Sequence, residues 1–113
     1  MQLPEEGYLL RIFIGESDRH EGKPLYEWIV IQARAQELAG ATVLRGLMGY
    51  GANSHAIQTF KIERLSTDLP MIVEIVDTKE KLEKFLTSVE STIKDGLVTM
   101  EKVQVRIYRS KGK

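Results

Sequence analysis

The chain has 113 residues, of which 42% are apolar and 28% are charged, and its formal net charge at pH 7 is zero. This length and balance predict a single soluble domain, residues 1–113, and argue against nucleic-acid binding, which usually needs a basic excess. Without cysteine, a signal-peptide pattern or an apolar run near the roughly 20 residues of a membrane helix, the sequence predicts a cytoplasmic protein that has no disulfides, thiolate metal sites or membrane insertion.

The first half of the chain is expected to form a strand, a helix and a second strand. Alternating apolar residues predict a strand over residues 8–14, and the polar stretch 15–23 that follows is interpreted as a loop. Pro24 is expected at the first position of a helix over 25–38, where the missing N–H of proline would have no partner anyway. A second apolar stripe indicates either deep burial of this helix or a subunit contact (Trp28, Ile31, Ala35, Leu38).

The next segment joins a strand to a turn that glycines flank. Gly40 is interpreted as the helix stop, and β-forming residues predict a strand over 42–48. Gly49-Tyr50-Gly51 follows this strand. Glycine can adopt positive φ, which would let the backbone bend here or approach a ligand closely. A polar loop comes next, and weak alternation over 59–65 could add a hairpin strand.

The second half repeats the order of strand, helix and strand. The apolar run 71–76 predicts a central and mostly buried strand. Asp77 and Glu80 have the spacing of a capping box for an amphipathic helix, whose expected end is Gly96. Residues 98–108 then alternate as a last strand.

Together these elements predict an α+β fold, a ferredoxin-like split βαβ sandwich in the order βαββαβ, with an antiparallel sheet and both helices on one face. The uncovered face of such a sheet would carry apolar side chains such as Leu9, Phe13 and Ile72. Association with other copies of the chain is the simplest way to cover a face of this kind, so the sequence predicts an oligomer.

Residues that could carry out chemistry are few. The sequence contains no nucleophile elbow, Walker loop or HExxH pattern. Asp18 and His20 in the polar stretch, together with His55, could serve a small metal-dependent enzyme, but their spacing matches no standard metal site. The glycine cluster after the second strand either ends a twisted strand or forms a backbone nest that holds phosphate.

Read in chain order, three segments closely resemble PII signalling proteins. They are the strand start Gly40-Ala41-Thr42-Val43, the turn Gly49-Tyr50-Gly51 and the strand Leu69-Pro70-Met71-Ile72-Val73-Glu74-Ile75-Val76. The stretch Gly15-Glu16-Ser17-Asp18-Arg19-His20, followed by Lys23-Pro24-Leu25, is more similar to an uncharacterised PII-like branch, a domain of unknown function, than to PII proper. The resemblance spans about residues 8–109.

This resemblance implies a ferredoxin-like homotrimer that binds an adenine nucleotide (AMP, ADP or ATP) in the clefts between subunits. It implies a regulatory protein without enzymatic activity, catalytic residues or metal, which signals to a protein target through a mobile loop. A membrane transporter is one conceivable target. The nucleotide-binding residues that the family pattern assigns are Thr42, Gly49, Tyr50, Gly51, Glu74, Val76, Arg106 and Arg109.

Two departures from the family pattern concern the phosphates. The glycine- and lysine-rich loop before the last strand is reduced to Lys94-Asp95-Gly96-Leu97, and the spacing from Thr42 to Gly49 is one residue longer than in the family. Both departures favour a nucleoside mono- or diphosphate over a triphosphate. The metal-dependent enzyme and a structural assembly subunit without a ligand are the alternatives.

Overall fold

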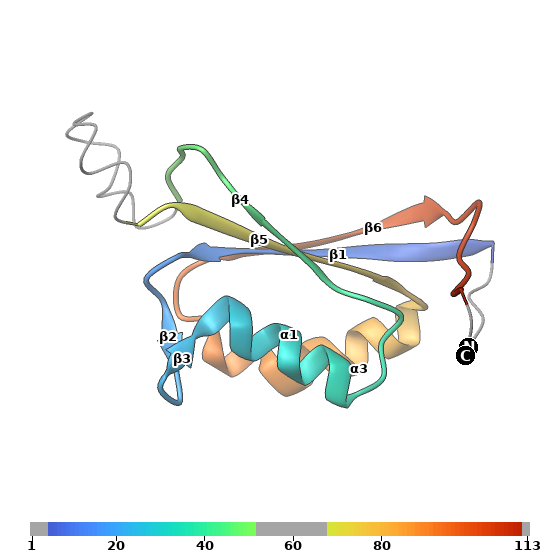
Figure 1. Ribbon diagram of the computed structural model, residues 1–113, viewed down its shortest axis with the longest axis horizontal. Coiled ribbons are helices and arrows are strands. Elements are labelled where there is room, and N and C mark those ends of the chain that lie inside the picture. The colour runs from blue at the N-terminus through green and yellow to red at the C-terminus, as the bar shows by residue number, and fades with distance from the viewer. Residues whose placement is uncertain (1–4, 52–67, 112–113) are drawn as a thin grey trace.

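A four-stranded antiparallel sheet lies over two helices (Figure 1) in the computed structural model, which describes residues 5–51 and 68–111. The strands of the sheet are β1 (Glu6–Gly15), β4 (Thr42–Arg45), β5 (Pro70–Asp77) and β6 (Leu97–Gln104). The helices are α1 (Leu25–Ala35) and α3 (Lys79–Val89), and the 3₁₀ turn η2 (Glu90–Thr92) follows α3. The strand order β4-β5-β1-β6 confirms the predicted ferredoxin-like sandwich.

The hydrophobic core fills the space between the sheet and the helices. Side chains alternate between the two faces of a strand, so every second residue of β1 and β5 points toward the helices. These are Leu10, Ile12 and Ile14 of β1, and Met71, Val73 and Ile75 of β5. They pack with Leu25, Ile29 and Ala33 of α1 and with Leu82, Phe85 and Val89 of α3. Each of these side chains is at most 5% exposed, so the main apolar stripes of the sequence are confirmed as core.

The polar stretch 15–23 is not the irregular loop that its composition suggested. It contains a short hairpin, in which β2 (Arg19–His20) pairs with β3 (Lys23–Pro24). The turn between the two strands uses positive φ at Glu21 (53°) and Gly22 (80°), the backbone of a tight hairpin turn. Strands of two residues are too short to show an alternating pattern, which is why the sequence did not reveal them.

The predicted helix over 25–38 is shorter than expected at its end. Pro24 is the residue before α1, and α1 ends at Ala35, because Glu37 turns to a φ of 61° and the Leu38 N–H donates to the carbonyl of Ala33. Trp28 and Leu38 of the second stripe pack against the core, but Ile31 is 42% exposed, so burial within one chain does not explain the whole stripe. A subunit contact through that stripe stays a prediction.

Two predicted helix signals have different roles from those expected. Thr78 caps the N-terminus of α3, with its Oγ1 accepting from the Lys81 N–H at 3.2 Å, so Asp77 and Glu80 form no capping box. Gly96 is not the helix stop, because α3 and η2 end before it and it directly precedes β6. A Cβ on Gly96 would lie 2.5 Å from the Phe13 carbonyl oxygen, so the close approach of residue 96 to the end of β1 is what requires glycine.

Two strands also end earlier than their patterns predicted. β4 ends at Arg45 instead of residue 48, and β6 ends at Gln104 instead of residue 108. The strand expected over 59–65 and the mobile loop expected after Gly51 lie outside the described residues. Neither described helix has the length and hydropathy needed to cross a membrane.

Candidate functional site

Two of the predicted binding residues lie side by side on the face of the sheet that the helices leave uncovered. Thr42 of β4 stands opposite Glu74 of β5, and Glu74 stands opposite Arg11 of β1. Arg11 Nε lies 3.0 Å from Glu74 Oε2, and 41% and 28% of these side chains are exposed. Val76 lies two residues along β5, and alternation places it on the same face. No sequence pattern indicated that Glu74 has a cationic partner on a neighbouring strand.

The C-terminal segment is fastened to the turn between α1 and β4. Tyr108 Oη donates to the carbonyl of Ala39 at 2.8 Å, while the Ala39 N–H donates to Asp77 Oδ2, also at 2.8 Å. The peptide groups of Ala39 are therefore held on both sides, by the tail and by the end of β5. This contact fixes where Arg106 and Arg109 lie, because both are close neighbours of Tyr108 in the chain. We call this region the tail end of the sheet.

The glycine-rich turn lies at the opposite end, which we call the glycine end. The Gly46 N–H donates to the Pro70 carbonyl at 2.7 Å, and a Cβ on Gly46 would lie 2.5 Å from Pro70 Cγ. The described glycines with positive φ are Gly22 and Gly96, so the expected use of positive φ at Gly49 and Gly51 is wrong for this conformation. Close approach to Pro70 at Gly46 is the actual steric requirement in this turn.

Apolar side chains project from the glycine end into solvent. Leu47 is 90% exposed, Met48 50% and Tyr50 68% within the described part of the chain. A Cβ on Gly51 would meet no described atom within 4 Å. Room around Gly51 and exposed side chains beside it are compatible with a contact surface at this turn.

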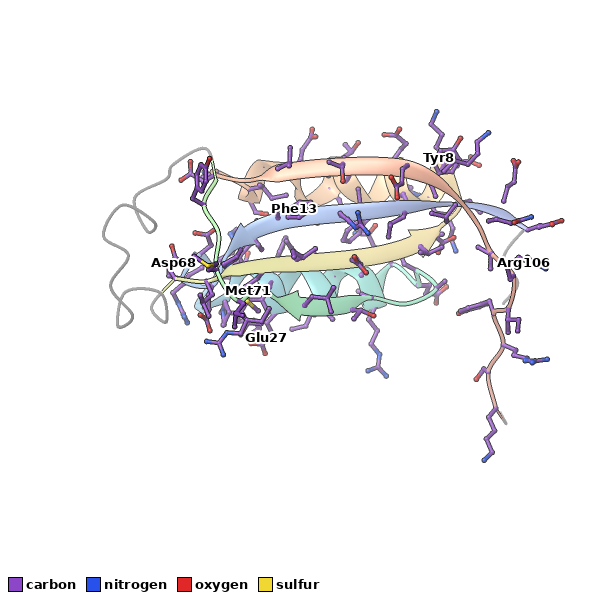
Figure 2. All side chains as sticks on the ribbon, turned by 90° about the horizontal axis from the view of Figure 1, so that it is seen from above. Tyr8, Phe13, Glu27, Asp68, Met71 and Arg106 are labelled. Carbon is purple, nitrogen blue, oxygen red and sulfur yellow. The ribbon has the colours of Figure 1, made fainter. Side chains whose placement is uncertain are left out.

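A single chain does not gather all the predicted binding residues. The glycine end is anchored at Pro70 and the tail end at Asp77, and the seven steps of β5 between them correspond to about 23 Å. Figure 2 shows Arg106 at one end of the molecule and Asp68 and Met71 at the other. Thr42 and Glu74 lie between the two ends. A nucleoside mono- or diphosphate is too short to touch both ends of one chain.

One group of contacts near the glycine end escaped the sequence interpretation. Arg45 Nη2 lies 2.7 Å from Glu16 Oε2, and the Glu16 N–H donates to the Leu69 carbonyl. The Ser17 N–H donates to Asp68 Oδ1 at 2.9 Å. These contacts join the corner after β1 to both β4 and the start of β5. The only hint in the sequence was the run of turn-forming residues after β1.

The residues of the alternative metal site have other partners. Asp18 Oδ2 accepts from the Gly15 N–H at 3.0 Å, and the Asp18 carbonyl accepts from the Leu25 N–H. His20 packs edge-on against Trp28, with ring centroids 4.4 Å apart, and its Nε2 lies 3.6 Å from Glu21 Oε2. Within residues 5–51 and 68–111, no three His, Asp or Glu side chains form a group that could hold a metal ion. His55 lies outside these residues.

Comparison with protein families gives one match over most of the chain. The model of the family DUF190, described as "Uncharacterized ACR, COG1993", matches residues 7–105. A UPF0166 protein of Aquifex aeolicus is 41% identical over 97 residues, which are 86% of this chain and 90% of that protein. A UPF0166 protein of Methanocaldococcus jannaschii is 36% identical over 91 residues, which are 80% of this chain and 82% of that protein.

Comparison with solved structures identifies the fold. The structure of CPII from Thiomonas intermedia K12, a nitrogen regulatory PII-like protein bound to ADP, AMP and bicarbonate, superposes with a TM-score of 0.63. The match covers 88% of each chain at 16% sequence identity. At this identity the likeness establishes the fold, which is PII-like.

Proposed function

The chain belongs to the DUF190 family, and on this premise we propose that it is a PII-like regulatory protein, which binds an adenine nucleotide between copies of itself. The observation that carries the proposal is the separation of the predicted binding residues into two ends of one PII-like sheet. When copies associate side by side, the glycine end of one copy can lie near the tail end of the next. Each nucleotide would then contact two chains.

The predicted binding residues divide between the tail end of one copy and the glycine end of the next. Arg106 and Arg109 at the tail end are the cations, and such side chains form charge-assisted hydrogen bonds to phosphate oxygens. Gly49 and Gly51 supply backbone N–H groups beside Tyr50, whose ring can pack on an adenine. Thr42 and Val76 line the uncovered face between these groups. A nucleoside mono- or diphosphate fits this set better than a triphosphate, because the phosphate loop before β6 is short.

Association as a homotrimer is part of the proposal. The uncovered face of the sheet carries apolar side chains on all four strands, and Leu44 and Leu97 at its edges are 45% and 57% exposed. An apolar face of this kind favours association, and three copies with their sheets facing inward would cover it. The protein would act by docking on a protein target, with a membrane transporter as a candidate, and would catalyse no reaction of its own.

A titration with AMP, ADP and ATP, each with and without Mg²⁺, tests the proposal by isothermal calorimetry. We expect saturable binding of AMP or ADP, weaker binding of ATP, no turnover and about one site per chain of the assembly. Replacing both Arg106 and Arg109 by alanine should abolish the binding, whereas Lys84→Ala on the exposed side of α3 should not change it. If none of the three nucleotides binds, the result would contradict the proposal and favour a structural subunit without a ligand. Metal-dependent turnover would favour the enzyme.

A further inference from the structure

The uncovered face of the sheet is organised in rows that run across the strands. The strand register places four apolar side chains in one row, in the order Leu44, Ile72, Phe13 and Leu97. The neighbouring row is polar and consists of Thr42, Glu74, Arg11 and Thr99. The row beyond it contains Val76, Leu9 and Glu101. A charged pair therefore lies in the middle of a face that is otherwise largely apolar.

The charged pair is poorly explained by the stability of one chain. Arg11 Nε lies 3.0 Å from Glu74 Oε2, and both side chains are partly exposed. Exposed ion pairs contribute about 0–1 kcal/mol, so this pair adds little to the folding of a chain by itself. A partner that covers the face would remove both charges from water, which is unfavourable unless the partner provides matching charges.

We propose that the Arg11–Glu74 pair restricts the uncovered face to other copies of this same chain. Each copy presents one cation and one anion in the same row, so the row is complementary to itself. In the assembly, Arg11 of one copy faces Glu74 of a neighbour while the apolar side chains of the rows on either side become buried. An unrelated apolar surface would bury the same two charges without new partners, so it would bind less tightly. This inference rests on the proposed assembly, and it identifies the charged pair as the feature that excludes other proteins from it.

Charge reversal separates contacts between copies from contacts within one chain. Arg11→Glu makes the row acidic, Glu74→Arg makes it basic, and the double variant restores one charge of each sign. Sedimentation velocity at micromolar concentration measures the assembly of the full-length variants, and circular dichroism verifies that each chain folds. Lys84→Glu is the matched control for Arg11→Glu, because it makes the same change in net charge, but on the exposed side of α3.

We expect Arg11→Glu alone and Glu74→Arg alone to associate about a hundredfold more weakly than the parent, because like-charged rows then face one another. In an equimolar mixture of the two, every mixed trimer has two contacts between oppositely charged rows and one between like-charged rows, so the mixture should associate more tightly than either variant alone but more weakly than the parent. The double variant and the Lys84→Glu control should assemble like the parent. Should a reversal not fold, Arg11→Gln and Glu74→Gln must show the same pattern with a smaller amplitude.

Three results would overturn the inference. If the double variant assembles but the mixture associates no more tightly than the single reversals, the pair acts only within one chain. If each single reversal assembles like the parent, the charged pair does not determine which partner binds the face, although the proposed assembly itself is not contradicted. A parent protein that stays monomeric would overturn the assembly on which both the inference and the proposed nucleotide site depend.

Discussion

Replacement of Asp77 tests how the tail end of the sheet is held together. Asp77 is 1% exposed, and its two carboxylate oxygens accept from the Ala39 N–H at 2.8 Å and from the Thr78 N–H at 2.7 Å. Asp77→Ala would leave both partly buried N–H groups without this acceptor. A lost hydrogen bond to a charged group corresponds to about 1.5–3 kcal/mol. Since nearby water can partly replace the acceptor, we expect the free energy of unfolding to fall by about 2–4 kcal/mol.

Urea denaturation at a fixed protein concentration measures this loss, and Thr78→Ala is the matched control. That control removes only the side-chain cap of the Lys81 N–H, so it should lower the free energy of unfolding by about 1 kcal/mol. Asp77→Ala should also weaken ADP binding, because the Ala39 peptide that holds Tyr108 would be freed on one side. An Asp77→Ala protein that is no less stable than the Thr78→Ala control would refute this explanation.

Three further substitutions give distinct expectations. Gly51→Val should leave the fold and the assembly intact, because a Cβ there meets no described atom within 4 Å. It should lower the ADP affinity at least tenfold by crowding the proposed backbone N–H site. An unchanged ADP affinity in calorimetry would show that the ligand lies elsewhere. Tyr108→Phe removes the 2.8 Å bond to Ala39, so we expect a few-fold loss of ADP affinity with little change in urea midpoint; equal affinity would show that this bond does not position the tail. Gly46→Ala places a Cβ 2.5 Å from Pro70 Cγ and should lower the free energy of unfolding by about 1–3 kcal/mol in thermal unfolding, whereas Gly51→Ala should not. Equal melting temperatures of these two variants would contradict the close approach at Gly46.

Much of the fold was predictable because it depends on periodic burial. The stripe of Leu25, Ile29 and Ala33 and the stripe of Leu82, Phe85 and Val89 were identified from spacing, and both are buried. Spacing could not reveal the β2–β3 hairpin, whose strands are two residues long. Nor could it show that Asp77 ends a strand while Thr78 caps the helix, because both residue types are common N-caps.

The candidate site was less predictable, because it depends on contacts between segments far apart in the sequence. The bond from Tyr108 to Ala39 joins residues 69 positions apart, and the Arg11–Glu74 pair joins residues 63 positions apart. No local pattern encodes such pairs. The resemblance to PII proteins located the candidate residues, whereas the structure was needed to learn that they occupy two ends of the sheet.

Mixing two binding-deficient variants tests most directly whether each nucleotide site is shared between copies. One variant carries Gly51→Val, which removes the binding contribution of the glycine end. The other carries Arg106→Ala with Arg109→Ala, which removes the contribution of the tail end. Alone, the Gly51→Val variant should bind ADP at least tenfold more weakly than the parent, and the arginine double variant should not bind it. After refolding an equimolar mixture into mixed trimers, ADP titration should recover about a quarter of the parental sites, because random mixing joins an intact tail end to an intact glycine end at that frequency. No recovered binding in trimers shown to contain both variants, while the parent binds ADP, would contradict a site formed between two chains.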